Sequence, residues 1–106
     1  MATVKVMAGV CGMSTTIKAT ADQPYGTVKL DIDSECPHVR KMAAELQEVQ
    51  SLGEISHRGE GPLTPRVAAK ALPHTACVVP VGIVKAIEVA AGLALPKDPT
   101  ITVSEE

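Results

Sequence analysis

Three isolated cysteines, with two histidines close to them in sequence, are the side chains of this chain best suited to chemistry. Cys11, Cys36 and Cys77 are its only cysteines, and His38 and His74 lie two residues after Cys36 and three residues before Cys77. Three sulfurs and one imidazole would complete the tetrahedral shell of Zn²⁺. Three sulfurs alone could hold an iron–sulfur cluster with one open position, although four cysteines are usual. The sequence therefore predicts a metal-binding protein, with Zn²⁺ or an iron–sulfur cluster held by the three cysteines and one of the histidines.

Two other interpretations of the cysteines stay open. Zinc ligands usually come as closely spaced Cys-x₂₋₄-Cys pairs, and here every cysteine stands alone. Cysteine is also a small hydrophobe that is common in protein cores, so all three thiols could be structural. Cys36 precedes Pro37, a residue favoured at the first position of a helix, and a helix N-terminus favours the reactive thiolate. Thiol redox or nucleophilic chemistry at Cys36 is thus a further hypothesis, and the sequence leaves open whether the protein is an enzyme.

Other polar groups have simpler explanations. Asp31 and Asp33 share the polar face of a predicted strand, and Lys85 and Glu88 stand three residues apart on a predicted helix, as ordinary surface neighbours do. The glycine-containing loop around residues 57–59 shows no Walker or dinucleotide-binding fingerprint. We expect solvated charges and an ordinary loop at these places, and the sequence leaves any small-molecule ligand unknown.

Composition excludes one class of partner. The chain has 106 residues, the usual size of one domain, so residues 1–106 are expected to share a single core. It contains no Phe and no Trp, and Tyr25 is its one aromatic residue, so it offers no platform on which bases could stack. The net charge of −2 gives no basic surface for a phosphate backbone. We therefore expect no nucleic-acid partner.

No segment predicts an export signal or a membrane span. The first ten residues are interrupted by Lys5 and are too short for a signal sequence. The longest apolar run, residues 76–95, contains Pro80, Lys85 and Glu88. We expect a cytoplasmic protein without membrane contact, and in that compartment cysteines are free thiols or metal ligands more often than disulfides.

Alternating apolar and polar residues predict three strands in the first third of the chain, within residues 3–10, 15–22 and 28–33. Each predicted strand has one polar face, which is typical of an antiparallel sheet covered on one side. In an up-down-up meander the first and third strands run parallel, so their final residues lie at the same end of the sheet. This arrangement places Cys11 and Cys36 at the same end and leaves the position of Cys77 undetermined.

Helical patterns fill the remainder of the chain. The spacing of apolar residues and the prolines predict helices at residues 37–53, 65–72 and 80–93, and a last strand at residues 100–103. The order βββαααβ predicts an α+β two-layer sandwich with a mainly antiparallel sheet covered on one face by helices. Because the third helix is almost entirely apolar, it is either the central helix of the domain or a subunit interface. A non-enzymatic interaction module that forms a homodimer through this helix is therefore an alternative function.

Four sequence motifs together resemble a family of small uncharacterised prokaryotic proteins that carry cysteines and have about the length of this chain. The motifs are Val10-Cys11-Gly12, Cys36-Pro37-His38-Val39, His74-Thr75-Ala76-Cys77 and the closing run from Lys85 to Pro96. The resemblance covers almost the whole chain. It implies an α+β fold and assigns no activity and no catalytic residue.

Overall fold

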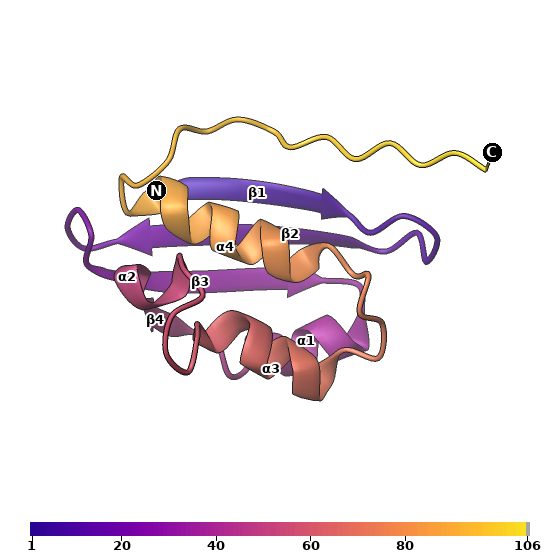
Figure 1. Cartoon of the computed structure of the whole chain (residues 1–106), viewed down its shortest axis with the longest axis horizontal. Helices are drawn as coiled ribbons and strands as arrows, with labels where there is room; N and C mark the ends of the chain where they lie inside the picture. The colour runs from indigo at the N-terminus through magenta and orange to yellow at the C-terminus, as the bar shows by residue number, and fades with distance from the viewer. Residues whose placement is uncertain (106) are drawn as a thin grey trace.

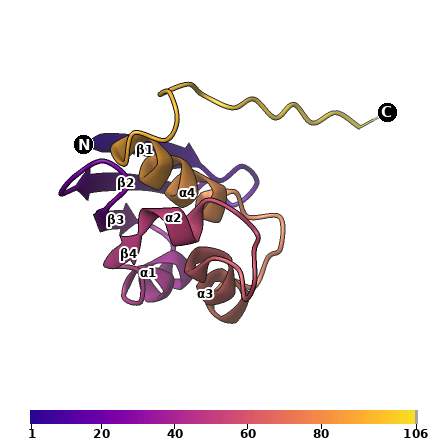
Figure 2. The same cartoon turned by 60° about the vertical axis from the view of Figure 1, so that its left-hand side comes forward.

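The computed structural model describes residues 1–105 and shows a four-stranded antiparallel sheet with the helices packed on one of its faces (Figures 1 and 2). The strands lie in the spatial order β1-β2-β3-β4, which confirms the predicted meander, and the α+β class is confirmed as well. The elements in chain order are β1 (Ala2–Met7), β2 (Ser14–Ala21), β3 (Thr27–Ser34), α1 (Pro37–Ala43), β4 (Glu48–Gln50), α2 (Ser51–Glu54), α3 (Leu63–Ala71) and α4 (Val79–Ala90).

The register of the strands follows from their alternating side chains. Ile17 of β2 pairs with Ile32 of β3, and Val28 of β3 pairs with Val49 of β4, so apolar residues meet on the covered face. Ile83 and Ile87 of α4 pack on this face and are completely buried. The core is aliphatic, as the composition predicts, because the single aromatic side chain, Tyr25, is 56% exposed.

A close contact between α4 and the sheet depends on Gly82. A Cβ atom at this position would lie 2.5 Å from Cγ2 of Val6 in β1 and 3.4 Å from Cδ1 of Ile17 in β2. The absence of a side chain therefore lets α4 lie directly on the first two strands. This packing confirms that the apolar third helix is the central helix of the domain, whereas a homodimer through α4 stays a hypothesis, with Val81 as its most exposed apolar side chain.

The helix predicted at residues 37–53 is shorter than expected. α1 ends at Ala43, and Val49 lies in β4, where it pairs with Val28 and is buried. The apolar residues at 39, 42, 46 and 49 fit a helix, but the last one instead extends the sheet. No glycine or proline marks this change of structure, and pairing with β3 overrides the local helical pattern.

The strand predicted at residues 100–103 is not formed. This segment lies outside the sheet, with Ile101 74% and Val103 88% exposed to solvent. Figures 1 and 2 show the end of the chain as an extended segment beyond α4. A strand needs a hydrogen-bonded neighbour, and no strand within residues 1–105 pairs with this segment.

Candidate functional site

Cys11 lies in the loop between β1 and β2, residues 8–13, and is exposed and free. Gly9 and Gly12 on either side of it adopt positive φ angles of 94° and 71°, which glycine tolerates and other residues rarely adopt. No atom lies within 4 Å of the position that a Cβ would take at either glycine. The loop therefore stands out into solvent rather than packing on the sheet.

Cys36 lies between β3 and α1 and is partly buried against the core. It is the N-cap residue of α1, with Pro37 next to it at the start of the helix, as the sequence predicts. Its N–H donates to the hydroxyl of Ser34 at 3.0 Å, and that hydroxyl lies 2.7 Å from the hydroxyl of Thr15 on the neighbouring strand. The backbone at Cys36 is thus attached to two strands.

The stretch before Cys36 is held by an arginine from α1. Nη1 of Arg40 donates to the carbonyl oxygens of Ser34 and Glu35, at 3.0 and 3.2 Å. The carboxylate of Glu35 in turn accepts hydrogen bonds from Ser14 at the start of β2. The pKa of Glu35 is held below its usual value, first by the hydrogen bond from the Ser14 N–H and then by the one from its hydroxyl.

Cys77 lies in the segment that joins α3 to α4 and, like Cys36, is free and partly buried against the core. Its N–H donates to the carbonyl oxygen of His74 at 3.3 Å, which closes a turn that contains both residues. His74 is exposed, and so is His38 in the first turn of α1. Both imidazoles are therefore accessible from solvent.

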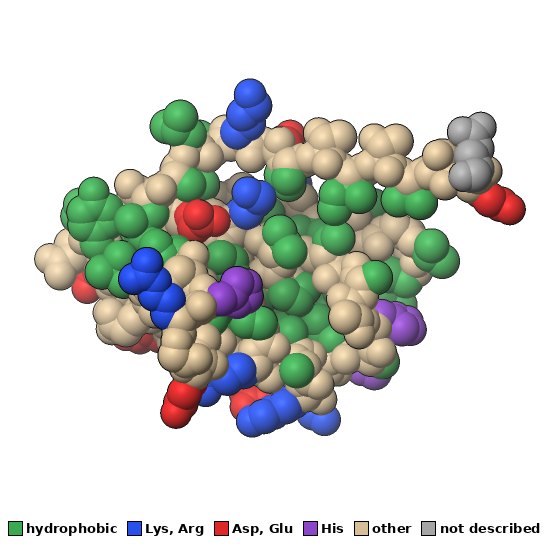
Figure 3. All heavy atoms as spheres, viewed as in Figure 1, with side chains coloured by type: hydrophobic (Ala, Val, Ile, Leu, Met, Phe, Trp, Pro, Cys, Tyr) green, Lys and Arg blue, Asp and Glu red, His purple; other side chains and the backbone are tan. Residues whose placement is uncertain are grey.

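The three segments that carry the cysteines lie at one end of the molecule. Figure 1 shows the β1–β2 loop, the end of β3 with the start of α1, and the α3–α4 segment at its right-hand end, where Figure 3 also shows histidine side chains on the surface. Among residues 1–105, however, no three Cys, His, Asp or Glu side chains are grouped closely enough to hold a metal ion. The fold thus brings together the segments but not the ligand atoms.

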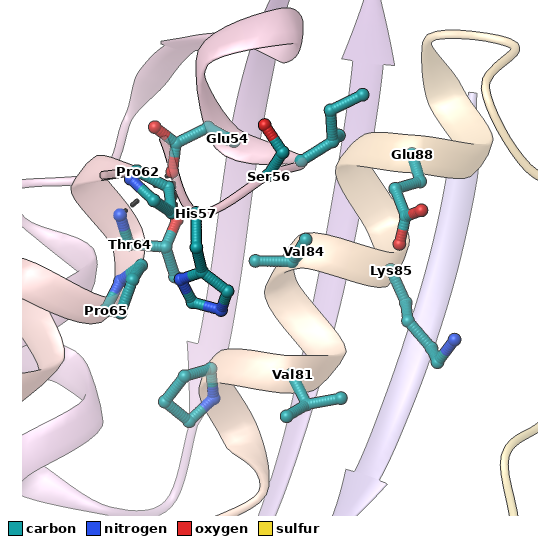
Figure 4. Close-up of a pocket in the computed structure, with 12 residues that line it drawn as sticks. Glu54, Ser56, His57, Pro62, Thr64, Pro65, Val81, Val84, Lys85 and Glu88 are labelled. Atoms are coloured by element: carbon teal, nitrogen blue, oxygen red, sulfur yellow. Dashed lines mark hydrogen bonds between the residues drawn. The ribbon is translucent and has the colours of Figure 1, made fainter. Parts of the chain in front are cut away.

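A separate hollow of about 260 Å³ lies between the loop after α2, the start of α3 and α4 (Figure 4). Its wall is mainly apolar, and Val84 of α4 and His57 point toward one another across it, whereas Lys85 points away. Lys85 and Glu88 are half-buried at its border, so they are less exposed than the predicted solvent-facing stripe.

Glu54 borders the same hollow, but its side chain caps the start of α3, a role that was not predicted from the sequence. This buried carboxylate accepts hydrogen bonds from the N–H groups of Leu63 and Thr64, both at 2.9 Å, and from the Thr64 hydroxyl. These are unpaired donors at the start of α3, so Glu54 caps that helix from nine residues upstream of Leu63. No regular spacing links Glu54 to the helix, since the intervening loop has no periodic pattern. With Glu54 occupied in this way and Lys85 pointing out, His57 is the main polar group directed into the hollow.

Comparison with known proteins gives one match. A model of a family of unknown function matches residues 2–103, nearly the whole chain. No curated protein and no solved structure matches. Within residues 1–105, none of the helices has the length and apolar character needed to cross a membrane.

Proposed function

We propose that this chain, which belongs to the family of unknown function DUF6951, is a small metal-binding protein. Cys11, Cys36 and Cys77 supply thiolates to Zn²⁺ or to an iron–sulfur cluster, and His74 or His38 supplies a further ligand. The observation that carries this proposal is the convergence of the three cysteine-bearing segments at one end of the sheet.

The surroundings of Cys36 and Cys77 suit metal ligands. Both thiols are free and lie partly exposed on the same aliphatic core, so a bound metal would have an apolar floor and an open side. The backbone around Cys36 is also fixed by Ser34 and Arg40, which limits the reorganisation that binding would require. Sites that are rigid before binding lose less conformational entropy.

The third thiol must move to complete the site. Cys11 is carried by a solvent-exposed loop, and its two flanking glycines with positive φ angles have open space around them. Closure of residues 8–13 over the end of the sheet would bring Cys11 toward the other two cysteines. Metal binding that orders a loop is the usual coupling between coordination and local folding.

The number of ligands separates the two metal species. Structural zinc sites are four-coordinate, so Zn²⁺ needs the three thiolates and one imidazole. An iron–sulfur cluster held by three cysteines would keep one iron open, and it would depend less on the histidines. Substitution of His74 and of His38 therefore distinguishes these two forms of the proposal.

The test is the metal content of untagged protein purified without oxygen or chelator. We expect about one zinc per chain, or several iron atoms with sulfide, and loss of that metal on Cys11→Ser, Cys36→Ser or Cys77→Ser. His57→Asn is the matched control, since His57 lies at the hollow beside α4 and not at the cysteine end. Wild-type protein without metal, which also fails to bind added Zn²⁺ or a reconstituted cluster, would refute the proposal.

Thiol chemistry at Cys36 is the second candidate function, favoured by its partly exposed position at the start of α1. It predicts that Cys36 reacts with an alkylating reagent faster than the exposed Cys11 in protein that contains no metal. The interaction module of the sequence analysis makes a different prediction, namely that an oligomer forms and persists when all three cysteines are replaced by serine.

A further inference from the structure

Among the residues that the structure describes, no strand pairs with the outer edge of β1. β1 is the first strand of the four in the sheet, and it pairs only with β2. Alternate residues of an edge strand present unpaired N–H and C=O groups, which form a template for another strand. Val4 and Val6 of β1 pack against the core from the covered face of the sheet, yet both stay partly exposed.

The end of the same chain has the sequence of a strand but no partner. After Leu93, whose N–H donates to the carbonyl oxygen of Glu88, residues 94–105 make no hydrogen bond in the described structure. Thr100, Ile101, Thr102 and Val103 alternate β-branched polar and apolar side chains, the pattern of a half-covered strand. The family match extends to residue 103 and so covers these four positions. We call residues 100–105 the tail.

The tail and the β1 edge are complementary in their pattern of apolar and polar side chains. A strand added to β1 with Ile101 and Val103 on the core side would cover Val4 and Val6, and its threonines would join the polar face of the sheet.

We propose that the tail of each chain adds as a strand to β1 of a second copy, and that two copies exchange their tails reciprocally. The segment between α4 and the tail contains Pro96 and Pro99, which favour an extended, semi-rigid spacer over a tight return to the chain's own β1. Figures 1 and 2 show this segment extended on the outer side of β1 without joining the sheet. The seven residues 94–100 span up to about 23 Å, enough to reach a neighbouring molecule. Exchange of an identical element is a common route to a symmetric dimer.

The first experiment measures the molar mass of the full chain by light scattering over a range of protein concentrations, with and without metal. We expect a dimer that dissociates on dilution. The double variant Ile101→Asp/Val103→Asp should be monomeric and equally folded, because both side chains are solvent-exposed in the single chain. The matched control is Thr100→Asp/Thr102→Asp, which adds the same charges to the opposite face of the tail, near Lys5, and should remain dimeric.

Amide hydrogen exchange of the tail identifies its partner. In the proposed dimer the amides of residues 101–103 exchange slowly at high protein concentration and rapidly on dilution. A monomer with protected tail amides would mean that the tail pairs with its own β1, and a monomer with unprotected amides would mean that it pairs with neither; both outcomes overturn the proposal. A dimer that survives Ile101→Asp/Val103→Asp would also overturn it and would point to the α4 surface. None of these outcomes depends on the metal site.

Discussion

The carboxylate of Glu35 accepts two hydrogen bonds from Ser14, one from its N–H at 2.8 Å and one from its hydroxyl at 3.0 Å. The N–H of Glu35 also donates to the carbonyl oxygen of Ser14 at 3.1 Å. These three contacts join the end of β3 to the start of β2. They fix the backbone one residue before Cys36, so an exposed carboxylate helps to place one of the proposed ligands.

Glu35→Gln should reduce the stability of the protein at neutral pH and have little effect in acid. The hydrogen bonds from Ser14 lower the pKa of Glu35 in the folded protein below its usual value of 4.5. Its stabilising contribution is therefore present above pH 4.5 and is lost as the pH falls through the lowered pKa. Denaturant unfolding from neutral to acidic pH should show the difference between wild type and variant shrinking. The exposed Glu45→Gln is the control, and an unchanged difference across that range would contradict the prediction.

Gly82→Ala should destabilise the protein. Its Cβ would collide with Cγ2 of Val6 at 2.5 Å, and overpacking of this kind typically costs about 1–3 kcal/mol, more than the roughly 1 kcal/mol that alanine gains in a helix. Gly53→Ala in α2 is the matched control, because nothing lies within 4 Å of the added atom. It should be neutral or stabilising by up to about 1 kcal/mol in the same urea titration. Equal effects at the two glycines would show that α4 can shift away from the sheet without cost.

Glu54→Ala should lower the free energy of unfolding by about 2–3 kcal/mol, because it leaves buried donors at the start of α3 without an acceptor. Glu54→Gln keeps one carbonyl oxygen and should cost less, about 1 kcal/mol. Glu48→Gln on the exposed side of β4 serves as the reference. The prediction fails if Glu54→Ala unfolds at the same urea concentration as this reference.

Alkylation of the metal-free, reduced protein should modify Cys11 first, since it is exposed whereas Cys36 and Cys77 are partly buried. Addition of Zn²⁺ should slow all three thiols together, because a coordinated thiolate is a poorer nucleophile than a free one. Mass spectrometry of each cysteine-containing peptide gives the individual rates. Protection of Cys36 and Cys77 without Cys11 would show that the β1–β2 loop does not close over the site.

The sequence was sufficient to predict the first three strands of the sheet, because the alternation of apolar and polar residues shows which face of a strand is covered. Residues at every second position of β2 and β3, such as Ile17 and Val28, are buried, and the residues next to them are more exposed. At Val49 the prediction from helical spacing was wrong. A single apolar residue at helical spacing also fits a strand of three residues. The choice there is made by the free edge of β3, which lies far away in the sequence.

For the candidate site, the sequence predicted which segments lie close together but not how far apart their thiols are. Parallel directions of β1 and β3 place their final residues at one end, and the structure has this arrangement. The separation of the thiols was not predictable, because it depends on loop conformation around Cys11 and on the path between α3 and α4. The capping role of Glu54 was not predictable either, because it depends on the conformation of a loop that has no periodic sequence pattern.

An aliphatic core with one exposed tyrosine also makes this protein nearly transparent in the near ultraviolet. Indole is absent, and the weak absorption of Tyr25 is the only aromatic background. A charge-transfer band between sulfur and a metal would therefore be measured against very little protein absorption. Cobalt substituted for zinc could be followed by absorbance at low protein concentration. The same feature means that absorbance measurements need an independent determination of protein concentration.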